Sequence, residues 1–69
     1  MIKVRDMIRV LKKLGFFKWH QVGSHAQYKH SDGRRTTLPI HYGKDVGKKM
    51  LHGIIHDIGI TVEELRDLL

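Results

Sequence analysis

The chain has 69 residues, enough for one domain spanning residues 1–69 but too few for a second hydrophobic core. Its 13 Lys and Arg outnumber 7 Asp and Glu, giving a formal charge of +6 before six histidines are counted. This excess makes nucleic acid, an anionic membrane or an acidic protein the first partners to consider, although a basic charge also serves solubility alone. The absence of cysteine excludes disulfides and thiolate metal sites.

Two further classes are disfavoured by the sequence. The first residues enter a charged amphipathic segment and lack the apolar run of a signal peptide, and no stretch approaches the length of a membrane span. We therefore expect a cytoplasmic protein with no membrane partner. A domain this small uses nearly all its apolar residues for its own core, so we expect a shallow, open site without a cofactor.

An amphipathic helix is predicted for residues 4–14, where apolar side chains recur at i, i+3, i+4 and i+7. These side chains are Met7, Val10, Leu11 and Leu14. Gly15 supplies a C-terminal stop.

From Phe16 the apolar period changes to two, which is typical of strands, and further runs of this type cover residues 25–30 and 35–39. Gly23-Ser24 predicts a tight hairpin turn between the first two runs. The last two are joined by residues 31–33, which we expect to form a three-residue loop with Gly33 in the left-handed conformation.

This register assigns the side chains to two faces of a sheet. The face that we expect to form the core contains Phe17, Trp19, Ala26, Tyr28, Thr36 and Leu38. The opposite, polar and basic face contains Lys18, His20, His25, Gln27, Lys29, Arg35 and Thr37. A two-residue Asp32-Gly33 loop would instead place Leu38 among the lysines and is less consistent. Trp19 could stack on a base, but its predicted place favours packing in the core.

The loop 40–47 leads into a second helix, whose apolar stripe again follows the i, i+3, i+4, i+7 spacing. This stripe consists of Leu51, Ile54, Ile55 and Ile58, and Gly59 ends the helix. Thr61 and Glu64 have capping-box spacing, so residues 62–69 should form a short helix with Leu65, Leu68 and Leu69 available for packing. The predicted order is α-β-β-β-α plus a short helix. It corresponds to an α+β fold with a three-stranded antiparallel sheet covered on one face, the arrangement of double-stranded-RNA-binding domains.

His25 is the candidate for chemistry, because it follows the turn at the start of a strand and should point from the polar face. Imidazole can accept a proton from a ribose 2′-hydroxyl or donate one to a leaving 5′-oxygen, and this chemistry needs no metal. A surface histidine at a turn is the commoner situation, and the pattern alone favours it.

Basic residues that could neutralise phosphates surround the same predicted face and loop. They are Lys18, Lys29, Arg34, Arg35 and Lys44, although a basic run is often just a solvated surface. Tyr42, beside Lys44, is a candidate for a base contact. His52 and His56 have the i, i+4 spacing of metal ligands, but no zincin glutamate accompanies them, so we expect no metal site.

The segments Gly23 to His30 and Asp32 to Pro39, followed by Gly43-Lys44-Asp45, resemble the signature of the HicA (YcfA-like) toxins. The opening residues 4–8 and the segment 47–60 are similar to that family too. The resemblance therefore covers nearly the whole chain. Tyr42 departs from the pattern, because a proline is expected between His41 and Gly43.

The resemblance implies a double-stranded-RNA-binding-like fold, cleavage of mRNA independently of the ribosome, and neutralisation by a HicB antitoxin. It also implies that His25 is the catalytic histidine of an endoribonuclease. The RNA-binding residues expected around it are Ser24, Lys29, Arg34, Arg35 and Lys44. Two alternatives stay open: a non-catalytic RNA- or DNA-binding module of the same fold, and an adaptor that engages only an acidic protein.

Overall fold

The computed structural model describes residues 2–41 and 43–69, so the base contact expected of Tyr42 lies outside the described residues. Within them the chain follows the predicted order α-β-β-β-α-α, which confirms the α+β fold class. The elements are α1 (Val4–Lys13), β1 (Phe17–Val22), β2 (His25–Lys29), β3 (Arg35–Pro39), α2 (Lys48–Ile58) and α3 (Val62–Leu68).

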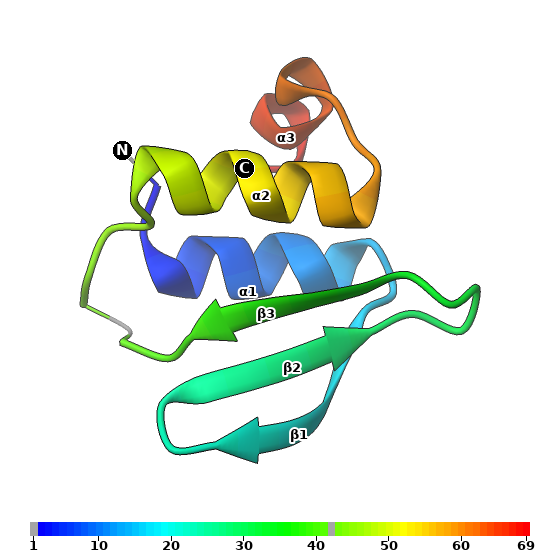
Figure 1. Cartoon of the computed structure of the whole chain (residues 1–69). Coiled ribbons are helices and arrows are strands. Elements are labelled where there is room, and N and C mark those ends of the chain that lie inside the picture. The colour runs from blue at the N-terminus through cyan, green and yellow to red at the C-terminus, as the bar shows by residue number, and fades with distance from the viewer. Residues whose placement is uncertain (1, 42) are drawn as a thin grey trace.

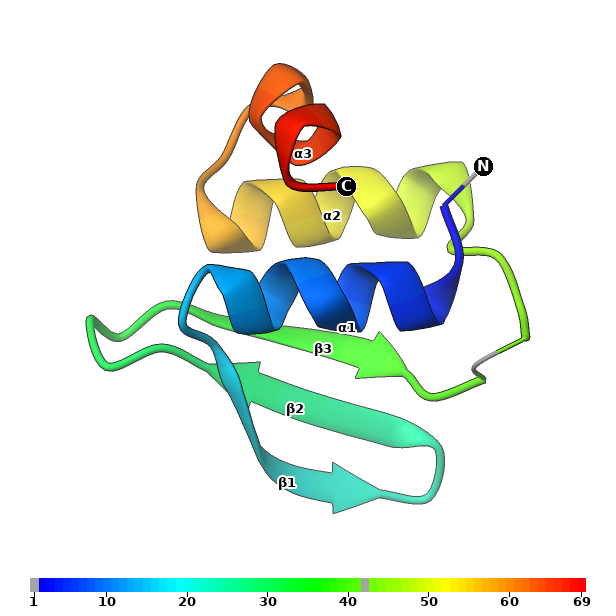
Figure 2. The ribbon, with the colours of Figure 1, turned by 180° about the vertical axis from the view of Figure 1, so that it is seen from behind.

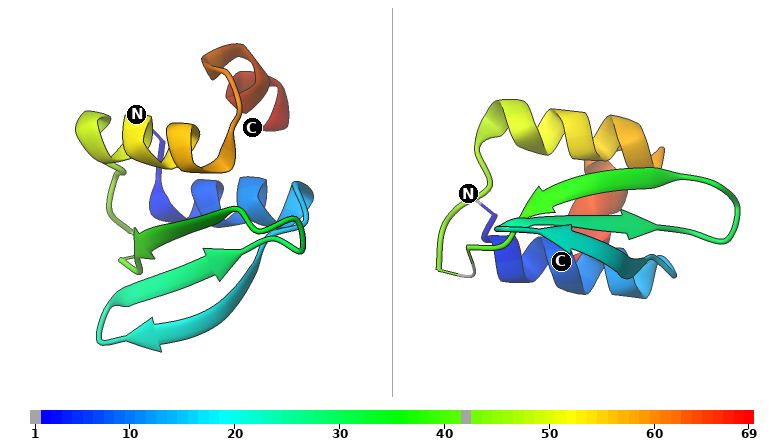
Figure 3. Two further views of the ribbon diagram at one scale, coloured as in Figure 1. Left: turned by 45° about the vertical axis from the view of Figure 1, so that its right-hand side comes forward. Right: turned by 60° about the horizontal axis from the view of Figure 1, so that its bottom comes forward.

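The molecule consists of a sheet backed by helices (Figure 1, Figure 2). The antiparallel strands have the order β1-β2-β3, so β2 is the central strand. Helices α1 and α2 lie side by side behind one face of this sheet, and α3 lies on their far side (Figure 3). The other face is left uncovered by the described helices, and we call it the outer face. On β2 it carries His25, Gln27 and Lys29.

The helices begin and end where the local sequence predicts. Lys12 and Lys13 lie in the last turn of α1, where their positive charges interact favourably with the negative end of the helix dipole. Gly15 follows with a φ of 92° and ends the helical segment. Gly59, with a φ of 70°, similarly ends α2. At α3, the hydroxyl of Thr61 accepts the Glu64 amide while the Glu64 carboxylate accepts the Thr61 amide, which confirms the capping box.

The hairpin from β2 to β3 has the predicted register. Ala26 lies opposite Leu38, Tyr28 lies opposite Thr36, and all four side chains are buried. The His30 amide donates to the Arg34 carbonyl at 2.9 Å, which closes a three-residue loop whose Gly33 has a φ of 98°. The alternation of buried and exposed residues on these two strands follows directly from this pairing.

The predicted faces of Phe17, Lys18 and Trp19 are wrong. The β1–β2 pairing steps from Lys18 opposite Tyr28 to His20 opposite Gln27, so Trp19 is the extra residue of a β-bulge. This one-residue slip reverses the faces of the residues before it. Phe17 lies opposite Lys29 on the outer face and is 48% exposed, and Trp19 is 42% exposed.

The aromatic core position at this end of the sheet belongs to Phe16, which precedes β1 and is only 2% exposed. Its ring meets the His30 ring edge-on, with centroids 5.2 Å apart. Lys18 lies opposite the buried Tyr28, and its ammonium donates to Gln21 at 2.9 Å, so it does not belong to the outer-face cations.

The core fills the space between the sheet and the helices. It consists of Ile2, Val4, Met7, Val10, Leu11, Phe16, Ala26, Tyr28, Leu38, Val46, Ile54, Ile55, Ile58 and Leu65. Leu68 packs against this cluster, whereas Leu69 is 55% exposed. The hydroxyl of buried Thr36 donates to the Asp57 carboxylate at 3.0 Å and links β3 to α2. Across the described residues, no helix is long and apolar enough to span a membrane.

Candidate active site

His25 is the first residue of the central strand and is exposed on the outer face. Its backbone is paired on both sides, with Val22 of β1 and Pro39 of β3. The preceding turn places Gly23 at a φ of 58°, a conformation that suits glycine at the first position of a two-residue hairpin. The imidazole therefore projects from a backbone that two neighbouring strands hold in place.

Ser24 joins this turn to the end of β3. Its carbonyl accepts the amide of Ile40 at 2.6 Å, and the residue is half-buried. The turn that carries His25 is thereby tied to the loop that leaves β3, so both segments lie at the same end of the sheet.

Lys44 belongs to that loop. The Lys44 amide donates to the His41 carbonyl at 2.8 Å, and the Lys44 carbonyl accepts the Val4 amide at 3.0 Å. These bonds fix the loop against the start of α1 while the Lys44 residue stays exposed. Among the cations expected to bind phosphate, Lys44 is the one at the His25 end of the sheet.

Lys29 and Arg35 lie opposite each other at the other end of the outer face. Lys29 lies four positions along β2 from His25, a distance of about 13 Å at the usual rise of a strand. The Lys29 ammonium lies 4.7 Å from the centroid of the Trp19 ring and 5.9 Å from that of Phe17. An extended polyanion would therefore have to lie along the sheet to contact both His25 and these cations.

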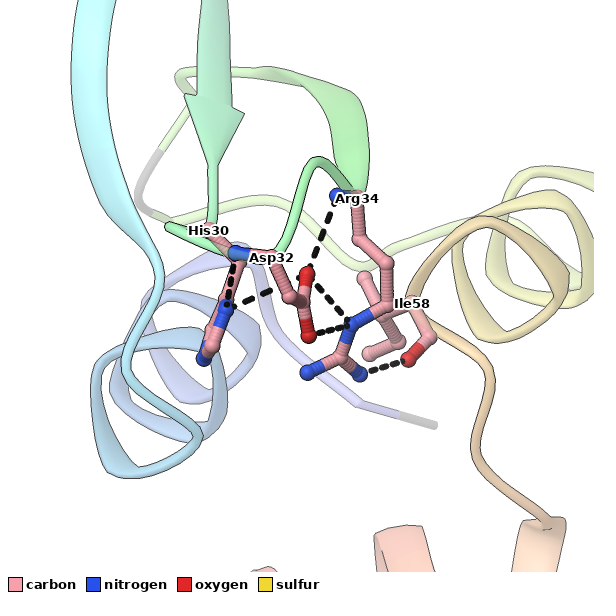
Figure 4. Close-up of polar contacts among 4 residues, drawn as sticks. All are labelled: His30, Asp32, Arg34 and Ile58. Atoms are coloured by element: carbon pink, nitrogen blue, oxygen red, sulfur yellow. Dashed lines mark hydrogen bonds and ion pairs between the residues drawn. The ribbon is translucent and has the colours of Figure 1, made fainter.

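Arg34 points away from this face. Its guanidinium donates to the Asp32 carboxylate at 2.8 Å and to the carbonyl of Ile58, the last residue of α2 (Figure 4). It also lies 5.0 Å from the centroid of the buried Phe16 ring. The Arg34 backbone amide, followed by its guanidinium, holds the pKa of Asp32 below its ordinary value of 3.8. This geometry gives Arg34 a structural role between the hairpin loop and α2.

The outer face is electrostatically one-sided. In the described part of the chain, the strands contain Lys, Arg and His but neither Asp nor Glu. Two carboxylates elsewhere face cations: Asp6 lies 3.6 Å from Arg9, and Asp45 lies 3.2 Å from Lys3. An anion approaching the outer face therefore meets strands that carry positive charge and no carboxylate of their own.

A groove between β3 and α2 opens beside the outer face and has a volume of about 830 Å³. Its lining includes Trp19 and Arg35 from the sheet and Lys48 and Lys49 from α2. The sequence does not reveal Trp19 as a surface residue, because alternation alone gives no sign of the bulge. The lysine pair at the start of α2 is visible in the sequence, but the groove beside it is not.

His52 and His56 are exposed on α2. Within residues 2–41 and 43–69, no three His, Cys, Asp or Glu side chains are grouped in a way that could hold a metal ion.

The molecule is thus a small basic α+β domain whose open sheet face carries an exposed histidine at a hairpin and cations along the same face. The family model described as "HicA toxin of bacterial toxin-antitoxin" matches residues 4–60. The chain therefore belongs to the HicA toxin family, and it is a toxin of a toxin-antitoxin system with an antitoxin partner. No curated protein matches the chain.

Proposed function

We propose that this toxin is an endoribonuclease that cleaves mRNA at His25 without a metal ion, and that a HicB-type antitoxin neutralises it. The observation that carries the proposal is the position of His25, exposed on a doubly paired strand at one end of a carboxylate-free sheet face. Membership of the HicA family supports the same assignment, because the chain is the toxin of its pair.

His25 supplies the proton transfer in this mechanism. As neutral imidazole it accepts the proton of a ribose 2′-hydroxyl while the 2′-oxygen bonds to phosphorus, and the bond from phosphorus to the 5′-oxygen breaks. The leaving 5′-oxygen takes a proton from the imidazolium or from water. Such proton transfer by a positioned side chain contributes about 10²- to 10⁴-fold to the rate.

The cations hold the RNA backbone. Lys44 lies at the His25 end and neutralises charge near the scissile phosphate, while Lys29 and Arg35 bind phosphates further along the face. Ser24, in the turn itself, helps to position the phosphate. Arg34 is left out of this proposal, because its guanidinium is already bonded to Asp32 and Ile58.

The test compares wild type with His25→Ala on a long RNA in EDTA, with circular dichroism showing that both are folded. We expect cleavage by wild type and a loss of about 10²-fold or more in the variant, which keeps most of its affinity because phosphate contacts dominate binding. His52→Ala is the matched control, since His52 is an exposed histidine of α2 and does not line the outer face or the groove. It should cleave at the wild-type rate.

Each other outcome has a definite meaning. Cleavage at the wild-type rate by folded His25→Ala would contradict the assignment of His25. Binding without cleavage by either protein would replace the proposal with the non-catalytic RNA-binding module. An adaptor for an acidic protein would show no salt-sensitive RNA binding.

A further inference from the structure

Two large aromatic side chains are exposed on the outer face. Trp19 is 42% exposed and Phe17 is 48% exposed, although side chains of this size usually bury most of their surface. The bulge and its register shift put both aromatic rings on the same side as Lys29, whose ammonium lies over them. The outer face thus presents flat apolar rings with a cation directly above them.

Trp19 also borders the groove between β3 and α2. The groove is lined by the cationic side chains of Arg35, Lys48 and Lys49. Asp57 also lines it, and its carboxylate accepts a hydrogen bond from the Thr36 hydroxyl. Trp19 therefore lies where the outer face passes into a positively charged groove. This arrangement of an aromatic ring beside cations is the one that binds single-stranded nucleic acid, with bases stacked on the ring and phosphates on the cations.

We propose that Trp19 stacks on an unpaired base of the RNA, and that the strand continues from there into the groove, where Lys48 and Lys49 bind its phosphates. The inference rests on the proposed function and adds that the substrate is single-stranded at this contact. A base inside a duplex is stacked on both faces and paired along one edge, so it offers no free face to a flat ring. When a base replaces the Lys29 ammonium over Trp19, that ammonium becomes available for a phosphate.

The experiment uses Trp19 as its own reporter, because it is the single tryptophan of the chain. Its fluorescence is followed in the His25→Ala protein, chosen because we expect it to cleave RNA at least about 10²-fold more slowly, during titration with a short unstructured RNA and with the same sequence as a duplex. The single strand should change the Trp19 emission at saturation, and the duplex should leave it nearly unchanged.

Binding of the labelled single strand is then measured by anisotropy after substitution in the same background. Trp19→Ala should weaken it by about 5-fold or more, the effect of losing one stacked base. Val62→Ala is the matched control, because Val62 is an apolar residue of α3 with 43% exposure and lies away from the groove. It should bind like the parent protein.

The path of the RNA strand through the groove is tested by the salt dependence of RNA binding. Lys48→Gln/Lys49→Gln should lower the slope of log Kd against log salt by about 1.4, since each phosphate contact to a single strand contributes about 0.7. Arg5→Gln/Lys12→Gln removes the same charge from exposed positions of α1, behind the sheet, and should leave the slope unchanged.

Unchanged Trp19 emission, equal response to the duplex, or wild-type affinity of Trp19→Ala would each overturn the inference, even if the wild type cleaves RNA. Stacking without cleavage would instead support the inference and contradict only the proposed catalysis. If RNA leaves the emission unchanged while the purified antitoxin alters it, the groove serves the antitoxin and the inference fails.

Discussion

Arg34 and Arg35 are adjacent in the sequence but have opposite surroundings. The side chain of Arg34 turns inward to Asp32, to the Ile58 carbonyl and to the Phe16 ring. Arg35 is exposed on the outer face opposite Lys29. The difference follows from strand geometry, because neighbouring side chains point to opposite faces and the loop residue Arg34 lies on the helix side. One arginine should therefore support the fold and the other the function.

Replacing each arginine by glutamine should separate these roles. Arg34→Gln loses a charge-assisted bond to Asp32 and the bond to the end of α2, so the free energy of unfolding should fall by about 1–3 kcal/mol. Arg35→Gln should leave stability within about 0.5 kcal/mol of wild type, as for most surface changes, and weaken RNA binding. Urea unfolding and RNA anisotropy measure the two quantities. Equal stability of the two variants would contradict the structural role of Arg34.

At the scale of elements, the prediction from the sequence fails in β1, where the structure has a bulge that the sequence does not indicate. The helices, their glycine stops, the capping box and the β2–β3 hairpin depend on local spacing, so they could be predicted from the sequence. The bulge at Trp19 depends on which aromatic residue reaches the core, and that is decided by tertiary packing of Phe16 beneath His30 and Arg34. Strict alternation gave the wrong residue, because Phe16 and Phe17 are chemically identical candidates.

The neighbouring phenylalanines provide a direct test of this register. Phe16→Ala should lower the free energy of unfolding by about 3–5 kcal/mol, the usual cost of truncating a buried phenylalanine. Phe17→Ala should cost less than about 1 kcal/mol, because that ring is 48% exposed. Thermal or denaturant unfolding of the two variants decides the matter. A larger loss for Phe17→Ala would indicate that Phe17, not Phe16, fills the core. The register without a bulge would then be correct, and Trp19 would lie on the core face.

The candidate site was only partly predictable, because local spacing can be recognised in the sequence whereas tertiary packing cannot. The exposed place of His25 at the start of β2 follows from the hairpin turn, and the outer-face positions of Lys29 and Arg35 follow from the β2–β3 register. The groove depends on how α2 packs against β3, which no short sequence pattern contains. The turn of Arg34 toward Ile58 likewise joins residues that are 24 positions apart.

At the scale of the whole molecule, the distribution of charge matters more than its total. The +6 charge attracts polyanions from any direction, and the described strands add a face that holds cations and no carboxylates. An antitoxin that neutralises this toxin by covering its RNA site would need an acidic surface against that face. The antitoxin and RNA would then compete for the same cations of the toxin.

Charge reversal tests this competition. Lys29→Glu/Arg35→Glu should slow association with the antitoxin by about 10-fold or more at low salt, because the rate of encounter depends on the complementary field at the contact. Arg5→Glu/Lys12→Glu changes the total charge by the same amount on α1, behind the sheet, so it isolates the contribution of the outer face. Association rates from surface plasmon resonance at two ionic strengths provide the comparison. The difference between the variants should shrink as salt screens exposed charges. If both double variants associate equally fast, or bind as tightly as wild type, the antitoxin contacts another surface, and inhibition would have to act without covering His25.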